Sequence, residues 1–223
     1  SLGHTRYDLG GAFKDLNATG TANTVDIGAR YPLIRSNRNN LWLSASGEYR
    51  DLQDKIGSTN TVTDKSIKTL HLGANGYHQD DWLMGGYTQW RVDNTFGRLT
   101  IDSADARAID SLSAKTEGAY YKIAANISRT QYFSPQFSAI LSLNGQWANK
   151  NLDPAEQMSL GGNVAVASYH SNDVSADIAL QGGLELRYAL TPYVSLSGFY
   201  DAGRAKLRAK PFVSGDNTVN LHG

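Results

Sequence analysis

The sequence predicts an all-β protein, an antiparallel up-and-down transmembrane β-barrel that is incomplete in these 223 residues. In the segment Val174–Leu190, every even-numbered residue is apolar or glycine and nearly every odd-numbered residue is polar, small or charged. Because successive side chains of a strand point to opposite faces, this segment is expected to form one long strand with an apolar face and a polar face. Soluble strands usually have about 5–6 residues, whereas about 9–11 tilted residues cross the hydrocarbon of a bilayer. The length therefore favours a transmembrane strand that extends beyond the bilayer.

The same alternation recurs along the chain and predicts about nine long strands. Alternation alone also fits a soluble β-sandwich, in which the apolar face would point inward. The expected strands span residues 3–16, 25–33, 41–50, 66–79, 82–98, 118–133, 137–147, 174–190 and 193–207.

The expected loops distinguish the two architectures, because short and long connections alternate. The short ones lie near residues 32–40, 78–82, 134–136 and 190–193. The longer, more polar ones lie near residues 15–24, 51–65, 99–117 and 151–173. Outer-membrane barrels have short periplasmic turns and longer extracellular loops, and a soluble barrel has no reason to sort its loops in this way.

Composition limits the classes of protein that remain. A mean hydropathy of −0.41 and the lack of an 18-residue apolar run do not fit a helical membrane protein. The absence of cysteine excludes a disulfide scaffold, and a formal net charge of zero gives no attraction to nucleic acid. The first residues show no signal peptide, so for an envelope protein we expect the natural N-terminus to lie further upstream. We expect no enzyme, metal site or cofactor, because the sequence contains neither an HExxH nor a GxSxG pattern.

Three segments carry a resemblance to a known family. They read YPLIRSNRNNLWLSASGEYRDLQDK, NLDPAEQMSLGGNVAVASY and LELRYALTPYVSLSGFYDAGRA. Together they resemble the outer-membrane transporters of two-partner secretion (TpsB proteins), the haemolysin secretion/activation family within the Omp85 superfamily. The resemblance runs essentially from end to end.

The resemblance implies a sixteen-stranded barrel in the outer membrane of a Gram-negative bacterium, preceded by two periplasmic POTRA domains that bind a secreted TpsA-type polypeptide. Residues 1–223 would be one partial barrel domain without POTRA domains, holding family strands five to thirteen, and Thr218–Gly223 would begin the fourteenth. A lumenal loop at about residues 153–173 would fold back into the barrel. Nine strands do not close a bacterial barrel, and an open edge in lipid leaves backbone groups unpaired.

The resemblance also implies a barrel-wall motif at Phe199, Asp201 and Gly203, which match the family's F-x-D-x-G. Their odd numbering places them on the polar face of their strand. In the family, the carboxylate holds an arginine at the tip of the lumenal loop, and such a charge-assisted hydrogen bond is physically reasonable on a lumen wall. From the residues alone, Asp201 could equally be a solvated lumen carboxylate.

The loop tip itself departs from the family pattern V-R-G-Y. The matching positions are Val166, Ala167, Ser168 and Tyr169, so both the arginine and the glycine are replaced. Arg187, on the inward face of the neighbouring strand, is an alternative partner for Asp201. Three explanations stay open: an altered lock with the fold retained, a degenerate gene fragment, or a deliberate substitution.

Other inward positions carry charges of both signs. They are Arg30, Arg50, Arg187, Glu48 and Glu185. A mixed-charge lining suits a hydrated conduit for an unfolded polypeptide, and it suits a plain porin equally well. We therefore expect an outer-membrane pore that exports and activates a partner protein. The alternatives are a passive porin, a degenerate non-functional transporter fragment and, third, a soluble β-domain used for binding.

Overall fold

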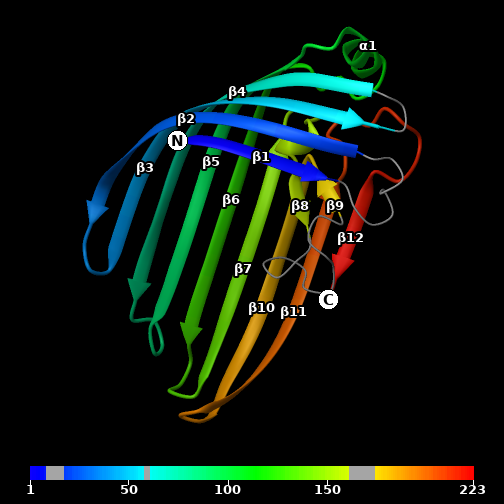
Figure 1. Ribbon diagram of the computed structural model, residues 1–223. Coiled ribbons are helices and arrows are strands. Elements are labelled where there is room, and N and C mark those ends of the chain that lie inside the picture. The colour runs from blue at the N-terminus through cyan, green and yellow to red at the C-terminus, as the bar shows by residue number, and fades with distance from the viewer. Residues whose placement is uncertain (9–17, 58–60, 161–173) are drawn as a thin grey trace.

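The computed structural model describes residues 1–8, 18–57, 61–160 and 174–223, and one ten-stranded antiparallel sheet dominates it (Figure 1). Every strand of this sheet pairs with the next sheet strand along the chain, as in an up-and-down meander. The strands are β1 (Leu2–Asp8), β2 (Ala18–Arg35), β3 (Asn39–Ile56), β4 (Thr61–Asp80), β5 (Gly86–Ile101), β6 (Gly118–Tyr132), β7 (Phe137–Ala148), β10 (Ile178–Thr191), β11 (Val194–Lys206) and β12 (Thr218–His222). The predicted fold class is thus confirmed.

The remaining elements lie in the connections. They are the helix α1 (Ala104–Leu112), the 3₁₀ turn η2 (Pro154–Glu156) and a hairpin of β8 (Met158–Leu160) and β9 (Val174–Ala176). Among the described residues, no helix is long and apolar enough to cross a membrane.

Several predicted boundaries were wrong. The expected loop at 51–65 is mostly strand, because β3 and β4 stay paired up to Ile56 and Thr61. The expected loop at 99–117 contains α1, which the alternation pattern did not reveal. Polar strand ends that rise beyond the membrane lose the apolar alternation, so their pairing is hidden in the sequence.

The segment Val174–Leu190 is not a single strand, which corrects the first prediction. It divides at Asp177: the residues before it form β9, which pairs with β8, and the residues after it form β10, which pairs with β7 and β11. The side chain of Asp177 is fully buried and the chain bends there. The alternation continues through the bend, so periodicity did not indicate it.

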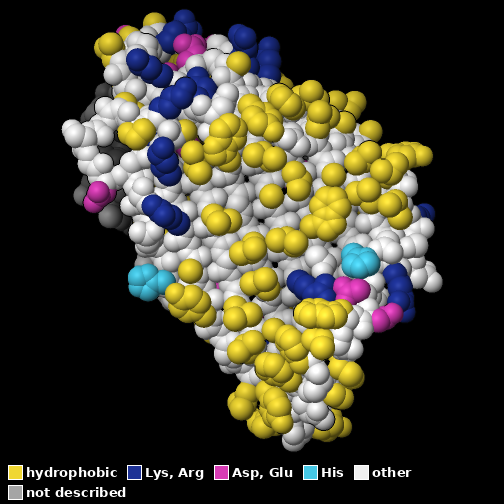
Figure 2. Space-filling model, turned by 180° about the vertical axis from the view of Figure 1, so that it is seen from behind, with side chains coloured by type: hydrophobic (Ala, Val, Ile, Leu, Met, Phe, Trp, Pro, Cys, Tyr) yellow, Lys and Arg dark blue, Asp and Glu magenta, His cyan; other side chains and the backbone are white. Residues whose placement is uncertain are grey.

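The two faces of the sheet differ as the alternation predicts. On the outer face, large apolar side chains are exposed, for example Ile27, Leu180 and Leu196 at 81%, 59% and 59% exposure. Figure 2 shows hydrophobic side chains spread widely over this face. Water-soluble proteins rarely expose an apolar surface of this extent, so this face is suited to lipid.

The short turns and the longer connections lie at opposite ends of the sheet. Figure 1 shows the β4–β5, β6–β7 and β10–β11 turns at one end and α1 at the other. The sheet curls, and the β8–β9 hairpin packs against β10, β11 and β12. The concave side therefore corresponds to the lumen of a barrel.

An apolar cluster fills the concave side toward the long-loop end. Its members are Leu52, Ile67, Leu99, Ile101, Tyr120, Ala148 and Leu152. The ring of Tyr120 lies over Gly97, its register partner on β5, in the space that any larger residue would occupy. Leu152 comes from the connection after β7, so this cluster packs the connection onto the wall.

Candidate functional site

The segment 151–157, here called the loop neck, folds onto the concave face of the sheet. Asp153 begins η2: its side chain accepts a hydrogen bond from the Ala155 amide at 3.0 Å, and Pro154 follows it. An aspartate cap followed by proline is a favourable start for a helical turn. The turn presents Glu156 to the barrel wall, where this side chain is only 4% exposed.

Glu156 pairs with cations from two separate strands. One carboxylate oxygen lies 3.2 Å from Arg50 on β3, and the other lies 2.9 Å from Lys122 on β6. Lys122 also donates to the Glu156 carbonyl at 2.8 Å, and Arg50 pairs with Glu48 on its own strand. A buried carboxylate requires such partners, because desolvation of an unpaired charge is very unfavourable.

A second ion pair fixes the beginning of the neck. Lys65 on β4 lies 2.9 Å from Asp153 and 2.9 Å from Asp54 on β3. The neck is therefore held by side chains of β3, β4 and β6. On β7, Gln146 donates to the carbonyls of Glu156 and Asp177, both at 3.4 Å.

Asp177 joins the neck to the connection after β11. Its carboxylate accepts hydrogen bonds from the Leu152 amide at 3.1 Å, from the side chain of Gln157 at 2.8 Å and from the Ala209 amide at 2.9 Å. These three donors come from two separate connections. Asp177 therefore lies where the chain leaves the lumenal hairpin and enters the barrel wall as β10.

The hairpin rests on a wall of small residues. Leu160 of β8 and Ala176 of β9 are fully buried, and they pack against Ala179, Ala205 and Leu221 of the three last strands of the sheet. The methyl side chains of Ala179 and Ala205 let the hairpin approach the wall closely. The loop tip, Val166, Ala167, Ser168 and Tyr169, lies outside the described residues.

The neck also contacts the connection that contains α1. Asn151 donates to the Ala114 carbonyl at 2.8 Å. That connection is closed by Asp110, which accepts from the amides of Thr116 and Glu117 at 2.9 and 3.0 Å. Partial burial alone would raise the pKa of Asp110, but these hydrogen bonds outweigh it and hold the pKa below its usual value.

The predicted wall motif lies on the concave face of β11, as expected. Phe199, Asp201 and Gly203 stand opposite Glu185, Gly183 and Gln181 on β10. The Asp201 carboxylate lies over Gly183, where an added Cβ atom would collide with its Oδ1 atom. Gly183 thus provides the space for this carboxylate. Phe199 is 64% exposed toward the lumen.

The remaining predicted lumen charges have separate partners. Arg187 lies opposite Ser197 and forms a two-point ion pair with Glu185 of its own strand, at 2.6 and 3.0 Å. Arg30 stacks over the Trp42 ring at 4.2 Å. Of the five predicted charges, only Arg50 and Glu48 take part in the loop-neck site.

Sequence reasoning missed the five residues that do most of the anchoring: Lys65, Lys122, Asp153, Glu156 and Asp177. Lys122 stands at an inward position of its strand, so parity could have indicated it. Asp153 and Glu156 lie in a connection, where no periodicity applies, and the alternation through Asp177 did not indicate its contacts. The described residues contain no cluster of histidine and acidic side chains suited to a metal ion.

This fold and site define a class: the wall of a transmembrane β-barrel with a long connection bound on its lumenal face. Residues 2–213 match the family described as haemolysin secretion/activation protein ShlB/FhaC/HecB, and the chain belongs to that family. It is a family of secretion proteins and not of enzymes.

Similar proteins agree with this membership. The heme/hemopexin transporter protein HuxB of Haemophilus influenzae is 26% identical over 208 residues, which cover 90% of this chain and 36% of HuxB. The structure of CdiB from Escherichia coli has a TM-score of 0.68 at 18% identity, covering 91% of this chain and 38% of CdiB. CdiB from Acinetobacter baumannii gives 0.62 at 12% identity, covering 97% and 38% of the two chains. The chain thus spans little more than a third of the length of these relatives.

Proposed function

We propose that this chain is part of the wall of an outer-membrane pore that exports, and in doing so activates, a TpsA-type partner protein in two-partner secretion. The observation that carries the proposal is the loop neck, which side chains from β3, β4 and β6 bind on the lumenal face. A connection held inside a barrel by ion pairs can restrict the pore at rest and can move without breaking the wall.

The lining of the wall supports a polypeptide as the transported molecule. Inward positions combine hydroxyl and amide side chains with opposite charges, such as Arg91 with Asp93 and Arg187 with Glu185. An extended polypeptide carries amides and side chains of both charges. A mixed polar wall offers weak, replaceable contacts along its length and no single strong site at which the chain would stop.

Opening would require the loop neck to leave the wall or to shift along it. When Glu156 separates from Arg50 and Lys122, all three groups enter a hydrated lumen and regain water. Recovered hydration offsets much of the lost attraction, as it does for ion pairs in general. The closed state is thus favoured modestly, and a partner that competes for the same side chains could shift the balance.

Asp201 is proposed as a second attachment point for the lumenal loop, on its own side of the barrel. We expect Asp201→Ala in the full-length transporter to reduce secretion of the partner several-fold, because the wall loses its carboxylate beside Gly183. The measurement is the amount of partner in the medium. Asp93→Ala on β5 is the matched control, since Asp93 pairs with Arg91 of its own strand.

Normal secretion by the Asp201 variant, with the loop in its normal position, would remove the proposed role of this residue. Secretion that depends on the unaltered transporter also distinguishes an export pore from a passive porin. A porin would conduct small solutes steadily, and its presence would not decide whether the partner reaches the medium.

A further inference from the structure

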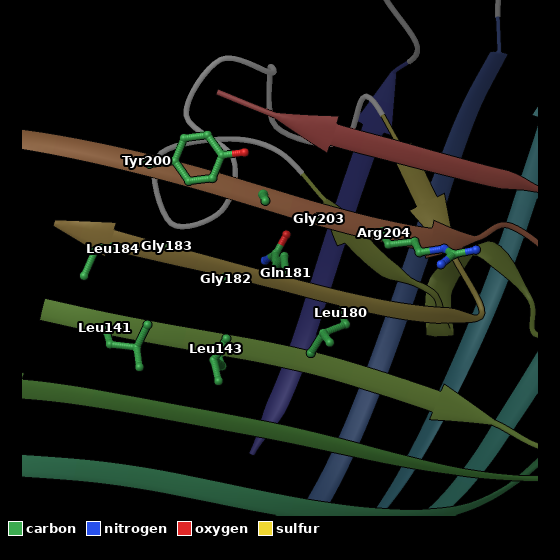
Figure 3. A pocket seen from close by; sticks show the side chains of 11 residues that line it. Leu141, Leu143, Leu180, Gln181, Gly182, Gly183, Leu184, Tyr200, Gly203 and Arg204 are labelled. Atoms are coloured by element: carbon green, nitrogen blue, oxygen red, sulfur yellow. The ribbon is translucent and has the colours of Figure 1, made fainter.

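A groove lies on the outer face of the sheet, where β7, β10 and β11 run side by side (Figure 3). Its volume is about 430 Å³. The outward-facing residues that form it are Leu141, Leu143, Leu180, Leu184, Tyr200 and Arg204. Apart from the tip of Tyr200, the only polar group among these side chains is the guanidinium of Arg204, at one end of the groove.

Gly182 lies at the base of the groove, beneath the side chain of Leu143. Gly182 pairs with Leu143 on one side and with Ala202 on the other. A Cβ atom at Gly182 would lie 2.6 Å from the Leu143 Cδ2 atom and 3.1 Å from the Ser142 carbonyl oxygen. The side chain of Leu143 therefore lies in the space over Gly182, and Gly182 adds no side chain of its own to the groove. The lining is almost wholly apolar, as an acyl chain requires.

Arg204 lies toward the long-loop end of β11 and points outward, opposite Leu180. Among the described residues, no carboxylate lies within ion-pair distance of its guanidinium. About 9–11 tilted residues cross the hydrocarbon, and counted from Val194 this distance ends close to Arg204. The cation is therefore expected at the level of the lipid headgroups. In Figure 2, most Lys and Arg side chains of this face also gather near its margin rather than across its apolar centre.

We propose that this groove binds a phosphorylated lipid of the outer leaflet, with one acyl chain along its apolar side chains and a phosphate on Arg204. A guanidinium suits phosphate because it donates two parallel hydrogen bonds. A peptide is a poor occupant, since its backbone groups would be left unpaired in hydrocarbon. The proposal concerns the lipid-facing surface and does not depend on the exported partner.

The test uses the full-length protein, purified in detergent, with lipid A as the phosphorylated probe and native mass spectrometry as the readout. We expect the unaltered protein to retain lipid A, and Arg204→Gln to lower its affinity about tenfold or more, as for the loss of a charged hydrogen bond. Arg204→Lys should recover part of the binding. Gly182→Leu and Ala202→Leu fill the groove from two strands and should each reduce retention to a similar extent.

Gly198→Leu is the matched control, because Gly198 faces outward on β11 and a Cβ atom there would meet nothing within 4 Å. Heat-modifiable gel mobility identifies the variants that fold. Equal retention of lipid A by the folded groove variants and by the Gly198 variant would overturn the proposal. So would equal retention of lipid A and of lipid A from which the phosphates have been removed, or displacement of lipid A by inorganic phosphate alone, since the site would then not recognise a phosphorylated lipid.

Discussion

Replacing Glu156 by glutamine in the full-length transporter is expected to release the loop neck from the barrel wall. Arg50 and Lys122 would then face a neutral amide at a site where the native carboxylate is 4% exposed. Breaking a buried ion pair by removing one partner typically destabilises by about 3–5 kcal/mol. We expect the lower end, roughly 3 kcal/mol, because the cations keep 21% and 15% exposure.

Two measurements check this prediction: urea unfolding, and conductance in a planar lipid bilayer, which should rise as the neck leaves the lumen. Glu185→Gln is the control, because it breaks an ion pair between exposed neighbours on one strand, at 30% and 53% exposure. Exposed pairs contribute about 0–1 kcal/mol, and this one does not touch the neck. If the two variants have equal stability and equal conductance, Glu156 does not anchor the loop.

Replacing Asp177 by alanine is expected to detach the β8–β9 hairpin. The substitution leaves the amides of Leu152 and Ala209 and the side chain of Gln157 without their acceptor. Each buried donor left unsatisfied costs about 1–3 kcal/mol, so the sum is large even if water reaches one of them. Asp177→Asn keeps the shape of the side chain and one acceptor oxygen. Its hairpin should therefore be held less firmly than in the unaltered protein and more firmly than in the alanine variant.

Hydrogen exchange of the amides in β8 and β9, measured by mass spectrometry, checks the Asp177 prediction. Exchange should accelerate strongly in the alanine variant while the amides of β4 and β5 remain protected. Asp216→Ala, in the exposed part of the connection after β11, should change neither. Unchanged protection of the hairpin in the Asp177 variant would show that packing on Ala179 and Ala205 suffices to hold it.

The strands and their order could be predicted from the sequence because each strand meets two different solvents. On β10, the apolar residues Leu180, Leu184 and Leu186 occupy the face suited to lipid. The charged residues Glu185 and Arg187 occupy the opposite face, which is suited to water. Because this preference applies at each position separately, it is visible in the local alternation of the sequence. The same parity placed Phe199 and Asp201 correctly on the inner face.

The break at Asp177 could not be predicted in this way. Alternation describes which face a side chain points to, and it is the same whether Val174 pairs with the barrel wall or with β8. The cause of the bend is a set of donors from residues 152, 157 and 209, which meet only in the folded chain. The helix α1 was hidden for a related reason, since a nine-residue helix in a polar loop leaves only a faint pattern.

The loop-neck site was missed because its partners are far apart in sequence. Parity identified Arg50 as an inward cation, but its carboxylate partner lies in a connection 106 residues later. Odd or even position indicates the face of a side chain only within a strand. Because Glu156 lies in a connection, the sequence did not indicate that it faces the wall. The family resemblance directed attention to the loop tip, whereas the described contacts lie at the base of the loop.

The most direct test of the pore is cysteine labelling of its wall, of which residues 1–223 contain no native cysteine. Single cysteines would replace Ser142 and Glu185 on the inner face, and Leu141 and Leu186 on the outer face, in the full-length transporter. A water-soluble maleimide should label the inner positions only. A partner arrested during export by a fused folded domain should then protect both inner positions. Equal labelling of Ser142→Cys and Glu185→Cys with and without the arrested partner would contradict passage of the polypeptide along this wall.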